Sequence, residues 1–432
     1  MTIAATNRYL AGLLEGRPAP QATPLGWFND LRAHAVDRVS ALSVPTTRDE
    51  DWRFTDISPL TKISFQPARG AGSLEAADIE PFVLPEAGAR LVFIDGVYAP
   101  RLSFNHWGVE VGTIAAGLSA TNSALQAHLG RHAGFDNNAF SALNTAFLND
   151  GAFVNVAANI IATKPVHLLF IATQAMAASY PRCLVMAAPG SAVSIIEDFV
   201  SLQDAAYFTN AVTEIAIADD ACVEHVRVQR EGAQAFHIAN CAVSLGHSSR
   251  YQSVSVAIGA RISRYNLNVE QTAEGAECAI DGLALINETQ LADTHTCIDH
   301  AKPHGVSRQQ HKCIVDGSAH AVFNGKIMVR HGAQLTNSSQ SSRNLLLSGK
   351  ARIDTKPQLE IFADDVKCAH GATVGQLDAD EIFYLKSRGL SETAARNLLT
   401  YAFGAEIIER ISVTSLKTRL EQTVLAQTSR PS

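Results

Sequence analysis

The sequence predicts a mainly β protein in which a long central region of strands lies between helical segments at the two ends of the chain. Three observations support this prediction. Between residues 153 and 375, short runs alternate apolar with polar residues, as strands with one buried face do. Glycines in turn-forming pairs separate these runs. Towards both termini, apolar residues instead recur every three or four positions, which is helical spacing.

Residues 1–90 are predicted to form an N-terminal helical domain that ends in a linker. One stripe at near-helical spacing is followed by Pro45 and consists of Trp27, Leu31, Ala35, Val39 and Leu42. Residues 69–90 are rich in Ala, Gly, Glu and Pro, a composition typical of a connecting segment.

The core domain, residues 91–377, is predicted to begin with a strand over 91–98 that contains an Asp95-Gly96 turn. A helical interlude follows at about 122–148, where Phe140, Leu143 and Phe147 recur at helical spacing. After it, the clearest strand runs are 193–201, 221–230, 236–246, 251–259, 264–271 and 279–286.

Turns between the strands are predicted at Glu231-Gly232, Gly246, Gly259, Glu274-Gly275, Asp281-Gly282, Asp316-Gly317, Asn324-Gly325 and Gly332. This region of about 220 residues is too long for one β-sandwich of ~100 residues. A parallel β-helix accommodates the length by repeating coils of about 20–25 residues. The sequence shows no clean repeat, so a large jelly roll and tandem sandwiches stay alternatives.

Residues 378–432 are predicted to form a C-terminal helical domain. Asp378 and Glu381 resemble a capping box at its start, and Gly389 suits the left-handed position that ends a helix. Ser391 is a candidate cap for the next helix, whose apolar stripe contains Leu399, Phe403 and Ile407. A last amphipathic segment spans about 414–427, and we expect it to dock on the core or to receive a partner.

Composition narrows the possible partners and location. The net charge of −7 gives no electrostatic footprint for nucleic acid or for an anionic membrane. The N-terminus lacks the pattern of a signal peptide, and no run of ~18 apolar residues occurs. The cysteines are seven and contain no C-x-x-C pair, which indicates reduced thiols in the cytoplasm: Cys183, Cys222, Cys241, Cys278, Cys297, Cys313 and Cys368.

The chain lacks the common catalytic motifs. It has no P-loop, no dinucleotide-binding glycine motif, no nucleophile elbow and no zincin motif. A set of potential ligands for iron, zinc or copper(I) instead lies in one stretch: His295, Cys297, His300, His304, His311, Cys313, His320 and His331. Their spacing matches no zinc motif, so we expect structural histidines at coil corners and exposed faces.

The second candidate site is the pair Cys368 and His370. On a strand, these residues point to one face at a separation of ~6–7 Å, close enough for one iron to join thiolate and imidazole. Lys367 would face the other side. The alternative is an inert free cysteine beside a hydrogen-bonded histidine. A third motif, RDEDWRFTD at 48–56, is interpreted as an anchor of the N-terminal helices on the core.

Several segments resemble the SufB/SufD family of scaffold subunits in SUF iron–sulfur cluster assembly, and most closely its SufD branch. The residues that carry the resemblance are HTCIDHAKPHGVSRQQHKCIV (295–315), AVFNGKIMV (321–329), NLLLSGKARIDTKPQLEIFADDVKCAHGATVGQLD (344–378) and FYLKSRGLS (383–391). RDEDWRFTD, VFIDGVY (92–98) and ALNTAFLNDG (142–151) match the N-terminal half. The resemblance covers roughly residues 45–410 and is most specific around Cys368 and His370.

The resemblance implies a right-handed parallel β-helix between helical domains, and a scaffold role rather than an enzyme acting alone. It implies a heterodimer with SufB through the β-helix and docking of the SufC ATPase on the C-terminal helices; an isolated chain could pair with itself. Cys368 and His370 would then lend ligands to a nascent iron–sulfur cluster shared with SufB. Some complexes of the family are associated with a flavin, for which the sequence offers no residue.

Three other functions stay open from the sequence. A β-helical carbohydrate lyase or hydrolase would need paired carboxylates or a basic cluster in a groove, which are not apparent. A metal-storing or metal-sensing protein would use the histidine-rich stretch. A purely structural β-helix subunit would leave Cys368 and His370 inert.

Overall fold

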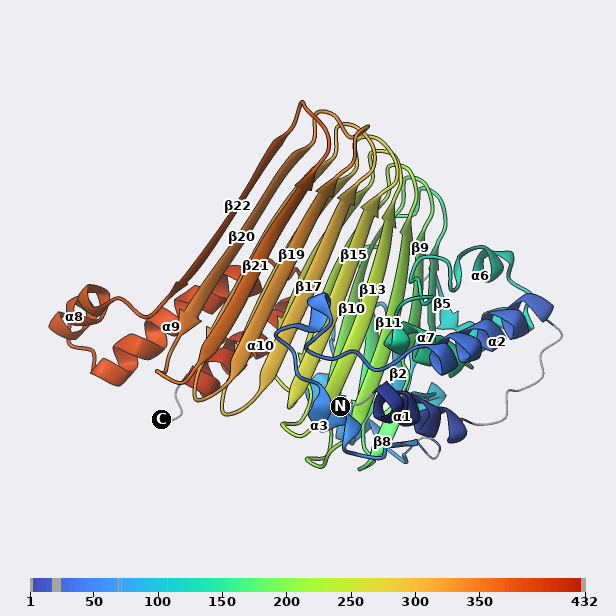
Figure 1. The fold of residues 1–432 in the computed structure, drawn as a ribbon, viewed down its shortest axis with the longest axis horizontal. Helices are drawn as coiled ribbons and strands as arrows, with labels where there is room; N and C mark the ends of the chain where they lie inside the picture. The colour runs from blue at the N-terminus through green and yellow to red at the C-terminus, as the bar shows by residue number, and fades with distance from the viewer. Residues whose placement is uncertain (1–2, 18–24, 69, 71, 107, 429–432) are drawn as a thin grey trace.

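The computed structural model describes residues 3–17, 25–68, 70, 72–106 and 108–428, and these form a parallel β-helix with helices packed on its outside (Figure 1). Successive strands go alternately to two 11-stranded sheets, so each full coil adds one strand to each sheet. The mainly β fold and the parallel β-helix are confirmed. Because consecutive coils pair in parallel, the chain is neither a jelly roll nor a pair of sandwiches, which are antiparallel.

The sheets have the following strands in spatial order. The first contains β21 (Arg352–Ile361), β19 (His320–Val329), β17 (Leu291–His300), β15 (Ile262–Gln271), β13 (Phe236–Leu245), β11 (Phe208–Ile217), β9 (Arg182–Ala187), β6 (Ala152–Val156) and β5 (Glu110–Thr113), with β8 (Ala177–Ser179) and β1 (Gln66–Pro67) beside it. The second contains β22 (Lys367–Gly375), β20 (Asn337–Leu346), β18 (Val306–Val315), β16 (Glu277–Ile286), β14 (Arg250–Ala257), β12 (Cys222–Arg230), β10 (Ala192–Ser201), β7 (Val166–Ala172), β2 (Ala89–Ile94) and β3 (Val97–Tyr98), with β4 (Phe104–Asn105) beside β2.

The coils are longer than the sequence predicted. Ile262 pairs with Phe236, which lies 26 residues earlier, and Arg352 pairs with His320, which lies 32 residues earlier. The predicted length of about 20–25 residues is therefore wrong. The reason is that most coils contain two strands of about ten residues, each followed by a corner. Coil length varies only at the corners, which explains why the sequence shows no fixed repeat.

Two of the predicted turns are wrong for a steric reason. Gly282 lies inside β16 and Gly325 inside β19. A Cβ at Gly282 would lie 2.4 Å from His311 Cδ2, and one at Gly325 would lie 1.8 Å from Gln340 Nε2. Gly282 therefore makes room for the side chain of its partner on the neighbouring strand, and Gly325 for a side chain from the opposite sheet, as glycines inside strands often do.

The helices cover the outer faces of the two sheets (Figure 1). The N-terminal part contains α1 (Ile3–Glu15), α2 (Gly26–Ala41), α3 (Ser58–Thr61), α4 (Ala76–Ile79), α5 (Ile114–Ser119), α6 (Ser123–His128) and α7 (Ala139–Ala146), with 3-10 turns η1 (Glu50–Trp52), η2 (Glu80–Phe82) and η3 (Pro100–Leu102). The C-terminal part contains α8 (Ala379–Ser387), α9 (Glu392–Ile408) and α10 (Thr414–Thr428). No helix among the described residues is long and apolar enough to cross a membrane.

The helix predictions hold in outline and differ in detail. The helix at 26–41 is present, but Phe28 and Arg32 are buried in place of the predicted Trp27 and Leu31. Arg32 can be buried because it donates to Asn149 Oδ1 at 2.9 Å. The interlude at 122–148 is two short helices, α6 and α7, joined by a loop, and the segment predicted as a linker contains α4 and η2. The predicted caps of the C-terminal helices, Asp378 and Ser391, are confirmed.

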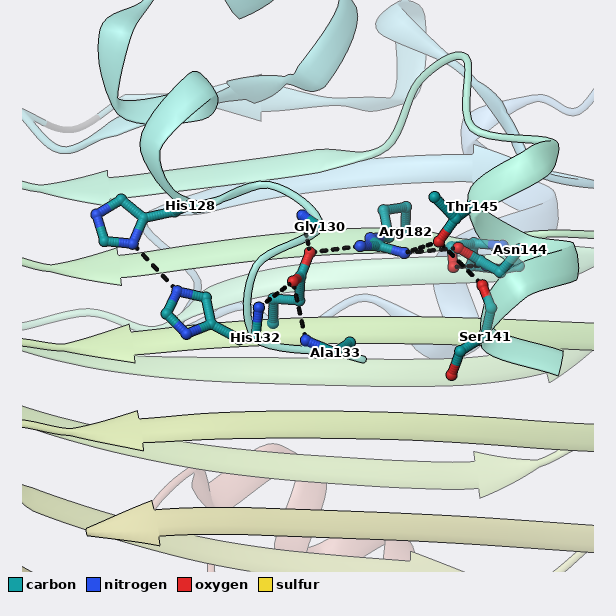
Figure 2. Close-up of polar contacts among 10 residues, drawn as sticks. His128, Gly130, His132, Ala133, Ser141, Asn144, Thr145 and Arg182 are labelled. Carbon is teal, nitrogen blue, oxygen red and sulfur yellow. Dashed lines mark hydrogen bonds and ion pairs between the residues drawn. The ribbon is translucent and has the colours of Figure 1, made fainter. Parts of the chain in front are cut away.

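A buried ion pair joins the N-terminal helical part to the β-helix (Figure 2). Arg182 on β9 and Glu214 on β11 are both fully buried and in direct contact. Glu214 also accepts the backbone N–H groups of Gly130, His132 and Ala133 at 2.8–3.0 Å, which fixes the loop between α6 and α7. Arg182 donates to Asn144 Oδ1 at 3.1 Å on α7. Burial would raise the pKa of Glu214, but Arg182 and these N–H groups lower it below its usual value.

We expect Arg182→Met to lower the free energy of unfolding by about 3–5 kcal/mol, because it leaves the Glu214 carboxylate buried without its partner. Thermal unfolding followed by circular dichroism measures the change. The double variant Arg182→Met/Glu214→Gln should recover part of the loss, since no unpaired charge remains. Arg352→Met, at an exposed ion pair, is the control and should change little. An equal effect of the two arginine variants would contradict the assignment.

Candidate functional site

The β-helix is open at its C-terminal end. β21 and β22 are the last strands in the spatial order of the two sheets, so each has one edge that pairs with no described strand. Their residues are mostly exposed or half-buried, in contrast to the strands of the earlier coils. An unpaired edge presents a row of free backbone N–H and C=O groups, which favours pairing with another chain.

Cys368 and His370 lie on this last strand. β22 is a strand as predicted, and Cys368 and His370 are in register with Ser338 and Gln340 of β20. Ser338 and Gln340 are buried in the lumen, the space between the two sheets. Side chains two residues apart share a face of a strand, so Cys368 and His370 both belong to the lumen face of the last coil. The structure thus brings the predicted pair together at the open end.

The two side chains have different surroundings. Cys368 is half-buried and packs against the cluster that contains Ile327, Val329 and Leu359, whereas His370 is exposed. Burial raises the pKa of the Cys368 thiol, an effect that a hydrogen bond from the Ser338 backbone partly offsets. The thiol is therefore protonated when no metal is bound, and a metal ion would have to displace the proton.

One thiol and one imidazole form an incomplete ligand set. An iron–sulfur cluster is held by four protein ligands as a rule. Within the described part of the chain, no three His, Cys, Asp or Glu side chains gather closely enough to hold a metal ion. Any cluster at Cys368 and His370 would consequently need further ligands from a second molecule, and the open edge is where such a molecule could approach.

The histidine-rich stretch does not converge on a site. His300 and His311 are buried in the lumen, where His300 bonds Ser307 at 2.9 Å and His311 stacks on Phe323 at 4.4 Å. Burial lowers the pKa of His300 to about 4 and that of His311 to about 3. His295 and His320 lie on outer faces beside Asp293 and Asp354. These histidines are structural, as expected, but two of them lie in the lumen rather than at corners.

The RDEDWRFTD motif packs on β15 and β17. Thr55 donates to the buried carboxylate of Asp293, and Arg264 both pairs with Asp293 and donates to the Asp51 carbonyl at 2.8 Å. The Arg264 guanidinium lies 4.2 Å from the centre of the Trp52 ring. Burial would raise the pKa of Asp293, but Arg264 and its other partners lower it to about 2. The interpretation of the motif as an anchor is confirmed.

An apolar surface lies on α8 and α9 and is called the α8–α9 patch below. This surface was not singled out from the sequence. Its exposed members are Phe383, Tyr384 and Leu398, with exposed fractions of 73%, 56% and 46%. Tyr384 and Leu398 line a shallow hollow of about 560 Å³ together with Leu385, Leu399 and Ala402. A patch of this kind on a polar helix pair commonly marks an interaction site. In the sequence, the adjacent aromatic residues Phe383 and Tyr384 were the feature that could have indicated this patch.

Two family models together match most of the chain. The model "SUF system FeS cluster assembly, SufBD core domain" matches residues 170–403, and "SufBD protein N-terminal region" matches residues 7–168. The chain belongs to the SufBD family. A SufBD-family iron–sulfur cluster assembly protein of Synechocystis is 43% identical over 416 residues, which cover 92% of this chain and 90% of the relative. SufD of Escherichia coli is 34% identical over 394 residues, covering 89% and 88%. SufD of Bacillus subtilis is 24% identical over 445 residues, covering 97% of each.

In this SufBD chain, buried neutral histidines should make stability fall with acidification. In the unfolded chain, both imidazoles bind a proton near pH 6.5. In the folded chain, His300 binds its proton only near pH 4 and His311 only near pH 3. The unfolded state therefore gains protons first, and stability decreases by up to about 1.4 kcal/mol per pH unit for each histidine between these values.

Unfolding temperatures measured from pH 7 to pH 4 test this expectation. The variant His300→Gln/His311→Gln should show a shallower fall than the natural chain. The surface variant His304→Gln is the control and should keep the natural slope. Identical slopes for all three proteins would show that His300 and His311 take up protons without unfolding.

Proposed function

We propose that this chain is the SufD-type, non-ATPase scaffold subunit of a SUF complex and that Cys368 and His370 provide part of the site for a nascent iron–sulfur cluster. The observation that carries the proposal is the position of this pair on the unpaired last strand of the β-helix. A thiolate and an imidazole are suitable iron ligands, and they lie where a second chain can add the missing ones. The SufD relatives of E. coli and B. subtilis support the subunit type.

The proposed partner at the open end is SufB. The last coil exposes apolar side chains next to the free strand edges, and their burial would add to backbone pairing: Leu335, Ile361, Phe362 and Val374. A paralogous β-helix with its own open end offers a matching edge. The same edge could join two copies of this chain when SufB is absent.

An incomplete, shared site suits assembly and transfer. A cluster held by ligands from both subunits loses part of its ligand set when the subunits move apart, and its release then needs no separate displacement of four strong bonds. Cys368 must also lose its proton for binding, so proton uptake favours release. This chain's role is to hold and to yield the cluster; a flavin has no residue assigned to it here.

We further propose that the α8–α9 patch receives the SufC ATPase. The patch lies outside the β-helix at the C-terminal end of the chain (Figure 1), so ATPase binding and the cluster site need not compete. Movement imposed on α8 and α9 would be passed to the β-helix through Lys312 of β18, which donates to the Phe403 carbonyl at 2.8 Å and pairs with Glu406 at 2.5 Å.

Replacement of either proposed ligand should reduce cluster assembly. We expect Cys368→Ala and His370→Ala to lower iron and sulfide per complex by about tenfold, a change typical of disturbed metal sites. The experiment is anaerobic reconstitution of this chain with SufB and SufC, followed by metal and sulfide analysis and visible absorption. Cys297→Ala, at a half-buried thiol on the outer face of β17, is the matched control and should retain its cluster. Full cluster content in both variants would refute the ligand assignment.

Polar substitutions in the α8–α9 patch should weaken SufC binding without unfolding the chain. We expect Tyr384→Asp/Leu398→Asp to reduce affinity for SufC by about tenfold or more, as loss of a hot spot that contributes about 1.4 kcal/mol would. Calorimetry with purified SufC measures it. Leu202→Asp, which changes a similarly exposed residue at a coil corner, is the control. Unchanged affinity in the patch variant would place the SufC site elsewhere.

A further inference from the structure

On the side of the second sheet, the lumen below the last coil is lined mostly by polar side chains. Four lumen positions of β20 are polar and buried, namely Ser338, Gln340, Ser342 and Asn344, and the fifth is Leu346. One coil deeper, β18 places Ser307, Gln309 and His311 in the lumen. Buried polar groups lower stability unless they are hydrogen-bonded, so the hydrogen-bond partners of these side chains are informative.

A chain of hydrogen bonds across the lumen ends at Gln340. Gln309 Nε2 donates to Thr296 Oγ1 at 2.7 Å, and Gln340 Nε2 donates to Gln309 Oε1 at 2.8 Å. This fixes the orientation of the Gln340 amide, because a flipped amide would place its oxygen against Gln309 Oε1. Gly325 leaves the space that the Gln340 amide occupies.

The oxygen of the Gln340 amide takes no part in this chain of hydrogen bonds. Gln340 is 3% exposed, and its Oε1 is buried without a hydrogen-bond partner among the described residues. Such an acceptor is uncommon in a folded protein, and a change of rotamer in a neighbouring donor would satisfy it. His370 is the residue in register with Gln340 on the next strand, ~4.8 Å away along the sheet.

We propose that Gln340 is a positioning residue for His370. Its Oε1 accepts the N–H of one imidazole nitrogen, which leaves the other nitrogen with its lone pair directed to the open end, where the cluster would bind. This inference rests on the proposed function of His370 and names the residue that would orient it. Carboxylate and carbonyl partners commonly fix the tautomer of metal-binding histidines in this way.

The geometry explains why a glutamine, rather than a smaller polar residue, occupies this position. Its amide nitrogen donates to Gln309, and its amide oxygen is left to accept a hydrogen bond from the neighbouring strand. The imidazole of His370 is exposed and would otherwise rotate among rotamers, so ligand binding would have to restrict it at an entropic cost. An acceptor fixed by Gln309 and Thr296 reduces that cost before the cluster arrives.

Histidine NMR of the isolated chain tests the contact directly. With ¹⁵N-labelled histidine, the His370 signals are those absent from His370→Ala, and their ring-nitrogen shifts report tautomer and hydrogen bonding. We expect Gln340→Met, which keeps the size of the side chain, to shift them towards those of a free histidine. Gln340→Glu keeps an oxygen acceptor for His370 but places its second oxygen against Gln309 Oε1, so it should move the shifts less than Gln340→Met does. Gln358→Met, on β21 at the same end, is the matched control.

Cluster retention gives the second readout. In the reconstituted complex with SufB and SufC, Gln340→Met should lose its cluster to a chelator about tenfold faster than the natural protein, with Gln340→Glu intermediate. Unchanged His370 shifts in Gln340→Met would overturn the inference while leaving the proposed function intact. Full cluster content in His370→Ala would refute the proposed function, whatever the state of Gln340.

Discussion

The constraint on which the whole molecule depends is the in-register parallel pairing of each strand with the strand one coil earlier. Between β11 and β13 the pairing runs without a slip from Phe208–Phe236 to Ile217–Leu245. Because side chains alternate between two faces, a slip of one residue would exchange lumen and surface along a whole strand. The register therefore decides together which residues fill the lumen, which outer faces the helices cover and which side chains the last coil presents.

The two ends of the β-helix meet this constraint in opposite ways. At the N-terminal end, short antiparallel strands complete the two sheets, and the α6–α7 region packs on the outer face of the first sheet through Arg182 and Glu214. At the C-terminal end, β21 and β22 have edges that pair with no described strand. The two sheets are thus capped at one end, whereas the other end keeps edges to which a further strand could be added.

The sequence predicted what depends on local periodicity and missed what depends on distant partners. The strands over 193–286 were located to within a few residues, and the placement of Cys368 and His370 on one face followed from a period of two. Gly282 and Gly325 were mistaken for turns, because a glycine that makes room for another side chain looks the same in the sequence as a glycine in a turn. The burial of Arg32 depends on Asn149, which lies 117 residues away, so no local pattern could reveal it. The open edge, likewise, is defined only by which coil comes last.

The position of Cys368 and His370 on the last coil has a consequence for how the protein is made. Each coil offers a ready edge to the next one, so winding can follow synthesis from the N-terminus. The closed end is then complete while the last coil is still in the ribosome, and Cys368 and His370 are added only near the end. A chain released early would still present a free strand edge, at an earlier coil, but without either ligand.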